Sequence, residues 1–210
     1  TLPLTLFPYT TLFRSTNAIN NPDIANKFLT SILNNSEKLS EMLDDLLELE
    51  KIEFGGLVLN KTKFNVKNQI ELILESQHML AEKNNIKITN YIDKNIKLRA
   101  DKDSFTTIFS NLINNAIKYS RLSNGIIDLK AIDTEDALII SVSDNGLGIE
   151  KQYLDKVFNR FYRTPKARAN TKGTGLGLSL VKQLCTRMNA VAEVESKIGK
   201  GTTIFVTFTR

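Results

Sequence analysis

The sequence predicts an α+β protein in which one long, bundle-type helix precedes a domain that mixes strands and helices. Apolar residues recur with heptad spacing between about residues 23 and 52, which is typical of a helix that packs against other helices. After the pair Gly55-Gly56, which ends that helix, short segments switch between the twofold period of strands and the 3.6-residue period of helices. The composition, with 41% hydrophobic and 24% charged residues, is that of a globular protein.

The apolar stripe of the first helix is wider than a two-stranded coiled coil requires. Asn35 interrupts its seam, as a register-fixing polar residue does in a coiled coil, and further apolar positions lie beside the seam. We therefore expect one helix of a bundle that pairs with its copy in a second chain. The stripe comprises Phe28, Ile32, Leu39, Met42, Leu46 and Leu49, widened by Leu33, Leu43 and Leu47.

Residues 1–15 do not match the rest of the chain. They hold two of the four prolines and a single charge, Arg14. A signal peptide would need a basic start and a small-residue cleavage site, and neither is present. We interpret the segment as an artefact, with the edge of a β-hairpin as the alternative reading, and we assign it no function.

Periodicity and turn residues predict the elements that follow Gly56. The helix that begins at residue 104 is expected to be capped by Asp103, and the last two strands are expected to form a hairpin around KIGKG. The predicted strands are 57–59, 86–92, 96–99, 126–132, 137–144, 190–196 and 202–209, and the predicted helices are 66–83, 104–120 and 177–188.

Composition excludes several kinds of site. The single cysteine, Cys185, cannot form an internal disulfide, and its helical spacing with Val181 and Leu184 favours a core position. The single histidine, His78, rules out a multi-histidine metal site. No window reaches the ~18 apolar residues that crossing a bilayer requires. The net charge of +5 is mild, so its location matters more than its size.

The helix that carries NLINNAIKYS presents a polar stripe. At 100° per residue, Asn111, Asn115 and Lys118 fall close together, turned away from the apolar face of the helix. An asparagine carbonyl is a hard oxygen ligand suited to Mg²⁺, and a lysine supplies a point charge for phosphate. The alternative is an exposed helix face without chemistry.

A carboxylate and two glycines follow a buried strand in the segment SDNGLGIE. Asp144 is placed to accept a hydrogen bond from an exocyclic amine such as that of adenine, while Gly146 and Gly148 allow the backbone to approach a ligand. The alternative is a plain turn, because Asp-Asn-Gly is a common turn sequence.

Three glycines at alternate positions open the helix that begins GTGLGLSLVK. The free N–H groups and the positive helix end make an anion site there, although the pattern is neither a P-loop nor a dinucleotide fingerprint. The basic charge of the chain gathers around it, since eight basic residues and no acid lie between Lys156 and Ala192. We expect the long polar segment TPKARANTK, residues 164–172, to act as a mobile lid.

Together with FNRFYR, these motifs resemble the catalytic ATP-binding domain of bacterial sensor histidine kinases, within the superfamily shared with DNA gyrase, a heat-shock chaperone and mismatch-repair ATPases. The resemblance covers residues 54–210 and implies a two-layer α/β sandwich, a mixed sheet covered on one face by helices. Residues 16–53 are similar to the second helix of the dimerisation and phosphotransfer domain that precedes it. Residues 1–15 stay outside both.

The resemblance also implies roles for individual residues. Asn115 matches the magnesium-binding asparagine, Asn111 supports metal and phosphates, Lys118 contacts phosphate, and Arg163 reaches the terminal phosphate. These four residues are also part of the implied nucleotide site. In that site Tyr119 packs beside the nucleoside and Asp144 contacts the adenine amine. The surrounding loops contribute Gly146, Gly148, Ile149, Gly173, Thr174, Gly175, Leu176, Gly177 and Leu178.

The function implied is binding of Mg²⁺ and ATP and transfer of the γ-phosphate to a histidine, then to an aspartate of a response regulator. The family acts as a dimer, and its catalytic region is cytoplasmic, with any membrane anchor upstream. The acceptor histidine belongs to a preceding helix, whose place residues 1–15 occupy here. His78 does not replace it, because Met79 and not an acid follows it in an ordinary amphipathic helix.

Three alternatives stay open. A relative that hydrolyses ATP to drive a conformational change would carry a glutamate at the position of Asn111. A nucleotide-binding interaction module without phosphotransfer would keep the same motifs. Nucleic-acid binding is disfavoured, because the basic residues cluster around glycines and do not alternate with exposed aromatic side chains.

Overall fold

The computed structural model describes residues 22–53, 58–120, 124–171 and 173–209, and the chain divides into two compact units, Thr1–Asp44 and Asp45–Arg210. The helix α2 runs from Pro22 to Glu53, close to the bounds that heptad spacing predicted. Large apolar side chains stay exposed along it, at Leu29, Ile32, Leu33, Leu39 and Leu43. The structure of residues 1–15 lies outside the described residues.

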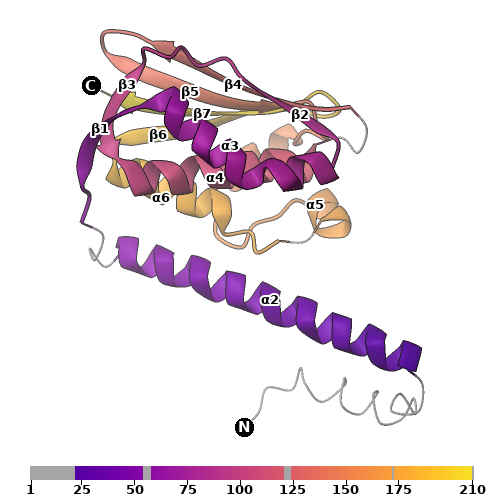
Figure 1. Ribbon diagram of the computed structural model, residues 1–210. Coiled ribbons are helices and arrows are strands. Elements are labelled where there is room, and N and C mark those ends of the chain that lie inside the picture. Colours follow the sequence, from indigo (N-terminus) through magenta and orange to yellow (C-terminus); the bar gives the residue numbers. More distant parts are fainter. Residues whose placement is uncertain (1–21, 54–57, 121–123, 172, 210) are drawn as a thin grey trace. The chain divides into compact units, whose positions relative to one another are not determined.

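A five-stranded mixed sheet forms one layer of the second unit, with the strand order β2-β4-β5-β7-β6 (Figure 1). The edge pair β2–β4 is parallel and the other three pairs are antiparallel. A separate antiparallel pair joins β1 to β3. The strands are β1 Lys61–Asn65, β2 Ile86–Asn90, β3 Lys97–Asp101, β4 Gly125–Asp133, β5 Ala137–Asp144, β6 Ala190–Lys197 and β7 Gly201–Thr209.

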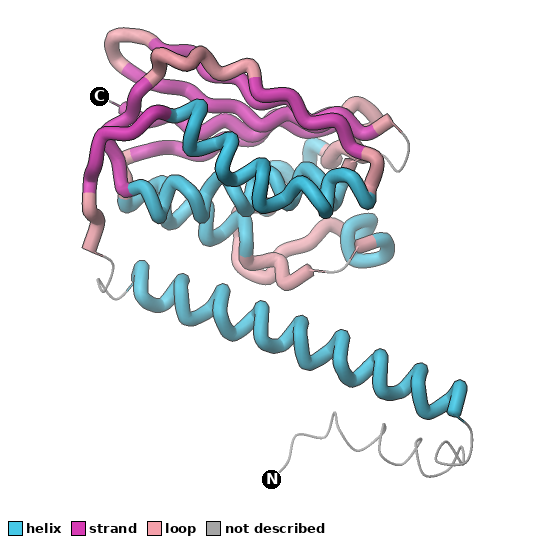
Figure 2. The backbone as a smooth tube through the Cα atoms, in the orientation of Figure 1, coloured by secondary structure: helices cyan, strands magenta, loops and turns pink. Residues whose placement is uncertain are grey.

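Three helices cover one face of this sheet: α3 Val66–Lys83, α4 Lys102–Tyr119 and α6 Gly177–Arg187 (Figure 2). Each helix is amphipathic, so burying its apolar stripe against the sheet removes that surface from water. This is the two-layer sandwich that the sequence analysis predicted. None of the described helices combines the length and the apolarity needed to cross a bilayer.

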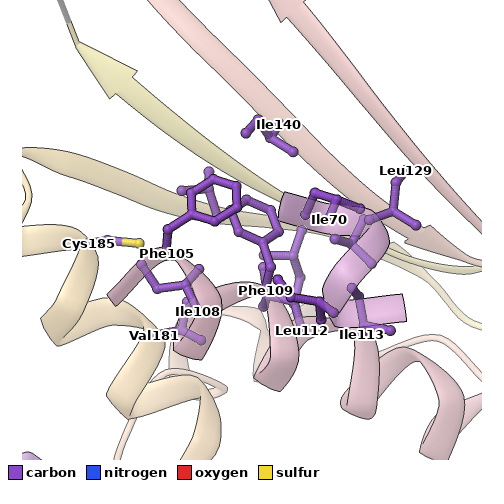
Figure 3. Close-up of a cluster of buried hydrophobic side chains, with 14 of the residues drawn as sticks. Ile70, Phe105, Ile108, Phe109, Leu112, Ile113, Leu129, Ile140, Val181 and Cys185 are labelled. Atoms are coloured by element: carbon purple, nitrogen blue, oxygen red, sulfur yellow. The ribbon is translucent and has the colours of Figure 1, made fainter. Parts of the chain in front are cut away.

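The core lies between α4 and the sheet, where Phe105 and Phe109 are fully buried with ring centroids 4.4 Å apart. Figure 3 shows these rings beneath Ile140 of β5. Burying a side chain of this size contributes about 1.5–3 kcal/mol. Cys185 lies in the same cluster, as its spacing predicted, and burial raises the pKa of its thiol to about 12.

Two details at the start of the domain correct the sequence analysis. The strand predicted at 57–59 is absent at residues 58 and 59, residue 57 being outside the described part, and β1 lies instead at 61–65. The cap of α4 is Asp101, whose Oδ1 accepts from Ser104 N at 2.8 Å, and not Asp103. Burial opposes ionisation of Asp101, but hydrogen bonds from Ser104 and Asn60 outweigh it and lower its pKa.

The basic segment before α6 also holds more regular structure than the predicted lid implied. A 3₁₀ helix, η2, spans Lys151–Lys156, and a short helix, α5, spans Pro165–Asn170. Thr164 caps α5 by accepting from Ala167 N at 3.2 Å, and Pro165 occupies the first helical turn, where its missing N–H costs nothing. In the described part of the predicted lid, residues 164–171, most residues belong to α5.

Candidate functional site

The polar stripe of α4 lies against the glycine-opened start of α6. A Cβ placed on Gly177 would lie 2.6 Å from Asn111 Oδ1 and 4.0 Å from Asn115 Nδ2. Asn111 Nδ2 donates to Thr107 O of its own helix at 2.9 Å, which turns its Oδ1 toward Gly177. The structure thus brings two predicted carboxamides beside a predicted glycine.

One turn further along α4, the Lys118 ammonium lies beside the same loop. Its Nζ is 2.6 Å from the position that a Cβ on Gly173 would occupy. Gly175 follows with φ +79°, a conformation that favours glycine, and a Cβ there would lie 2.9 Å from the Phe161 carbonyl carbon. The loop therefore passes close to a cation with no side chain between them.

Asp144 ends β5 with its carboxylate beside the last turn of α4. Its Oδ1 accepts from Gly146 N at 2.8 Å, and the backbone N–H of Thr202 on β7 also donates to the carboxylate. A Cβ on Gly146 would lie 2.2 Å from Tyr119 O, which accepts from Leu147 N at 3.2 Å. Burial raises the pKa of Asp144 to about 6 although both N–H donors act to lower it.

The loop that follows Asp144 is held by the β6–β7 hairpin. Gly148 has φ +69°, and a Cβ on it would lie 2.1 Å from Lys197 O. Leu147 O accepts from Gly199 N at 2.9 Å, and Ile149 N donates to Ser196 Oγ at 2.8 Å. These bonds place the predicted loop residues Gly146, Gly148 and Ile149 next to α4 on one side and to the hairpin on the other.

Arg163 donates hydrogen bonds to the predicted lid and to the glycine loop that follows it. Its guanidinium donates to Gly173 O at 3.2 Å, to Ala167 O at 2.6 Å and to Thr171 Oγ1 at 3.1 Å, and also bonds to Thr171 O. The predicted contact of this arginine with a terminal phosphate stays a prediction. Its position beside Gly173 brings it to the same loop as Lys118.

The remaining predicted residues form the entry to α6. Thr174 Oγ1 accepts from Leu176 N at 3.2 Å, and Leu176 O accepts from Leu180 N at 2.9 Å in the first turn of the helix. Leu176 is fully buried and Leu178 is packed against the core. They hold the glycine loop to the body of the domain.

A linked series of contacts thus joins all three predicted motifs. The stripe of α4 contacts the glycine loop through Asn111 and Lys118, and the end of α4 contacts the Asp144 loop through Tyr119 O. A positive phosphate-type surface and a carboxylate that accepts hydrogen bonds therefore lie along one helix. The described residues contain no cluster of histidine, cysteine, aspartate or glutamate that would hold a metal, so a metal ion here would depend on carboxamide oxygens.

Sequence reasoning missed two hydroxyl residues of this site, Ser196 and Thr202. Both lie in the hairpin that supports the Asp144 loop, and Thr202 pairs with Asp144 in the β5–β7 register. The only sequence signal was their place beside KIGKG, and nothing in that pattern indicates which strand the hairpin joins.

Known proteins resemble this chain in sequence. Residues 100–210 match the family described as histidine kinase-, DNA gyrase B-, and HSP90-like ATPase. The sensor histidine kinase WalK of Bacillus subtilis is 36% identical over 191 residues, which are 90% of this chain and 31% of that protein. WalK of Staphylococcus aureus is 33% identical over 187 residues, which are 88% of this chain and 45% of that protein. The chain thus spans less than half the length of these two relatives.

Solved structures show the same fold. Full-length ShkA in complex with AMPPNP superposes with a TM-score of 0.75 at 20% identity over 87% of this chain and 38% of that chain. The histidine kinase ThkA, solved in complex with the response regulator protein TrrA, superposes with a TM-score of 0.76 at 21% identity, over 95% of this chain and 55% of that chain.

Proposed function

We propose, because the chain belongs to the family of histidine kinase-, DNA gyrase B- and HSP90-like ATPases, that it binds ATP with Mg²⁺ and presents the γ-phosphate to a protein histidine. The observation that supports this most strongly is the placement along α4, where Asn111 and Lys118 lie against the glycine loop and Tyr119 O contacts the Asp144 loop. One nucleotide lying along this helix would meet each of these groups.

The Asp144 end suits a base. An ionised carboxylate that already accepts from Gly146 N and Thr202 N keeps lone pairs for the exocyclic amine of adenine. Tyr119 would pack beside the nucleoside and Ile149 would line the base. Gly146 and Gly148, which have no side chain, would let the backbone of this loop approach the base closely.

The glycine end suits a triphosphate. The Lys118 ammonium, the N–H groups of the loop and the positive N-terminal end of α6 all attract phosphate oxygens. Gly173, Thr174, Gly175, Leu176, Gly177 and Leu178 would surround the phosphates. The Arg163 guanidinium donates to backbone carbonyls, one of them that of Gly173 in the glycine loop. A rearrangement of the lid would therefore let Arg163 contact a terminal phosphate held by that loop.

The residues present fit a magnesium ion. Gly177 leaves a space beside Asn111 Oδ1 that a Cβ would fill, and hard carboxamide oxygens suit Mg²⁺. Asn115 would hold the ion with support from Asn111. When bound, the ion would neutralise charge on the phosphate oxygens.

The reaction is transfer of the γ-phosphoryl group to an imidazole nitrogen. A bond forms between that nitrogen and the γ-phosphorus, the bond from the γ-phosphorus to the bridging oxygen breaks, and ADP leaves. The proton on the other imidazole nitrogen would pass to the acid that follows the acceptor histidine in this family. Positioning and charge neutralisation carry most of this catalysis. Asn111 cannot accept a proton from water, which favours transfer to histidine over the rival hypothesis of ATP hydrolysis.

Partners follow from the same family. Residues 16–53 would be the second helix of a dimerisation and phosphotransfer domain and residues 54–210 the ATP-binding domain of a cytoplasmic catalytic region. The exposed apolar side chains of α2 support pairing with a second copy. A response regulator would take the phosphoryl group onto an aspartate, and the ThkA relative was solved with such a protein.

Calorimetry with the ATP analogue AMPPNP tests this proposal. The chain is expected to bind AMPPNP and ADP, more tightly with Mg²⁺ than without it. No binding heat at millimolar nucleotide would contradict the proposal. A steady-state assay should show phosphate release close to background, and rapid turnover would favour the hydrolysing alternative.

A further inference from the structure

A row of three polar side chains crosses the sheet beside the proposed base site. Ser196 on β6 pairs with Thr202 on β7, and Thr202 pairs with Asp144 on β5. Side chains alternate along a strand, and the buried Val142 and Ile204 lie two residues from Asp144 and Thr202. The row therefore lies on the face of the sheet that the helices cover.

Ser196 Oγ contacts three partners, and their chemistry determines where each hydrogen lies. Ile149 N is 2.8 Å away and can only donate. Gly201 O is 2.8 Å away and can only accept, so the single Ser196 hydrogen points to it.

Thr202 Oγ1, the third partner, is 2.9 Å from Ser196 Oγ. The Ser196 hydrogen is already used, so Thr202 must donate its own hydrogen to Ser196. The oxygen of Thr202 then offers only lone pairs to anything else that approaches it.

We propose that Ser196 is a positioning residue that makes the Thr202 hydroxyl an obligate hydrogen-bond acceptor beside Asp144. This inference rests on the proposed function and deepens it. Two neighbouring acceptors, a carboxylate and an oriented hydroxyl, match the two N–H bonds of an exocyclic amine. They repel the carbonyl oxygen that replaces this amine in hypoxanthine. Ser196 thereby contributes to selection of adenine without touching the nucleotide.

The preference for ADP over inosine diphosphate, measured by calorimetry, tests the role of Ser196. In Ser196→Ala the Thr202 hydroxyl is free to rotate and to donate toward a carbonyl, so the preference should fall by about five- to tenfold, the value of one oriented hydrogen bond. Ser196→Thr keeps the hydroxyl and should restore most of the preference. Ser196→Cys, with a weak donor and acceptor, should fall between them and serves if Ser196→Ala does not fold.

Ser143→Ala is the matched control. Ser143 Oγ and Thr203 Oγ1 form a hydroxyl pair at 2.8 Å between β5 and β7, one residue along from the Asp144–Thr202 pair and on the other face of the sheet. This variant removes a hydroxyl from the same sheet and should keep the wild-type preference for ADP.

The possible failures can be told apart. If the wild-type chain binds neither diphosphate, the proposed function fails and the role of Ser196 fails with it. If the wild-type chain prefers ADP and the folded Ser196 variants keep that preference unchanged, only the role of Ser196 is overturned. An equal loss in Ser143→Ala would also overturn it, because the effect would then be structural.

Discussion

Gly177 lies so close to Asn111 that a Cβ on the glycine would stand 2.6 Å from the Asn111 side-chain oxygen. Gly177 is the first residue of α6, so the contact joins two of the helices that cover the sheet. A side chain at this position would displace the carboxamide beside it, whereas a helix start does not by itself demand glycine.

Gly177→Ala should weaken nucleotide binding while leaving the stability of the fold nearly unchanged. Alanine is favoured over glycine within a helix by at most about 1 kcal/mol, so the free energy of unfolding should change by no more than that. The displaced Asn111 should weaken binding of Mg²⁺ and ADP about tenfold or more. Calorimetry and chemical unfolding of Gly177→Ala measure both quantities. Thr186→Ala, an exposed position on the same helix, is the control, and equal losses in the two variants would contradict the role of Asn111.

Asn115→Ala should lower the affinity for ADP more in the presence of Mg²⁺ than in its absence, because its carboxamide is proposed to hold the ion. The matched control is Asn114→Ala, which removes the same group from an exposed neighbouring position of α4. Titrations with and without Mg²⁺ give the comparison. Losses of the same size under both conditions would remove the metal-binding role.

Asp144 should make folding depend on pH. Its pKa in the folded protein is about 6, above the ordinary 3.8, so the folded state binds the proton more tightly than the unfolded state. Its contribution to stability is therefore most favourable below about pH 4 and falls as the pH rises through 6. Asp144→Asn should raise the free energy of unfolding at pH 7 by up to about 3 kcal/mol, and this gain should fade toward pH 4.

The affinity for nucleotide should depend on pH in the opposite direction to the Asp144 contribution to folding stability. Wild-type affinity for ADP should fall as the pH drops below 6, because a protonated carboxyl accepts the adenine amine poorly, and Asp144→Asn should bind ADP weakly at every pH. Unfolding titrations and calorimetry across this range measure both effects. Asp128→Asn, on the uncovered face of β4, is the control. A wild-type affinity independent of pH would count against the contact between Asp144 and adenine.

The 210-residue chain should form no acid-labile phosphohistidine when incubated alone with labelled ATP. His78, its single histidine, is exposed on α3, and its Nδ1 lies 3.5 Å from Glu82. Met79 follows it, so no acid stands next in sequence to accept its proton. The assay is acid and alkaline treatment of the labelled protein. A label that disappears in His78→Ala would prove this wrong.

Local sequence patterns predicted most of the helices and strands, and they predicted the polar stripe of α4 in the candidate site. The bounds of α3 and β5 match the predicted 66–83 and 137–144, because each has a clear apolar period. The stripe of Asn111, Asn115 and Lys118 follows from helix geometry alone. In contrast, β1 was missed because KTKFN has only one large apolar residue, and its long-range pairing with β3, from Lys61 with Asp101 to Asn65 with Lys97, decides its structure.

The sequence by itself determined the individual helices and strands through their periodicity, and its ordered motifs, through their resemblance to a known family, indicated the two-layer fold and the types of group that would bind a nucleotide. Periodicity and motifs are local properties of the chain. Only the tertiary structure decided that Arg163 donates to carbonyls of the predicted lid, that Gly177 lies against Asn111, and that the Ser196 hydroxyl contacts Thr202 beside Asp144. Those contacts arise when α4 packs beside α6 and β7 pairs with both β5 and β6. Such long-range packing depends on all the elements together, and no single segment encodes it.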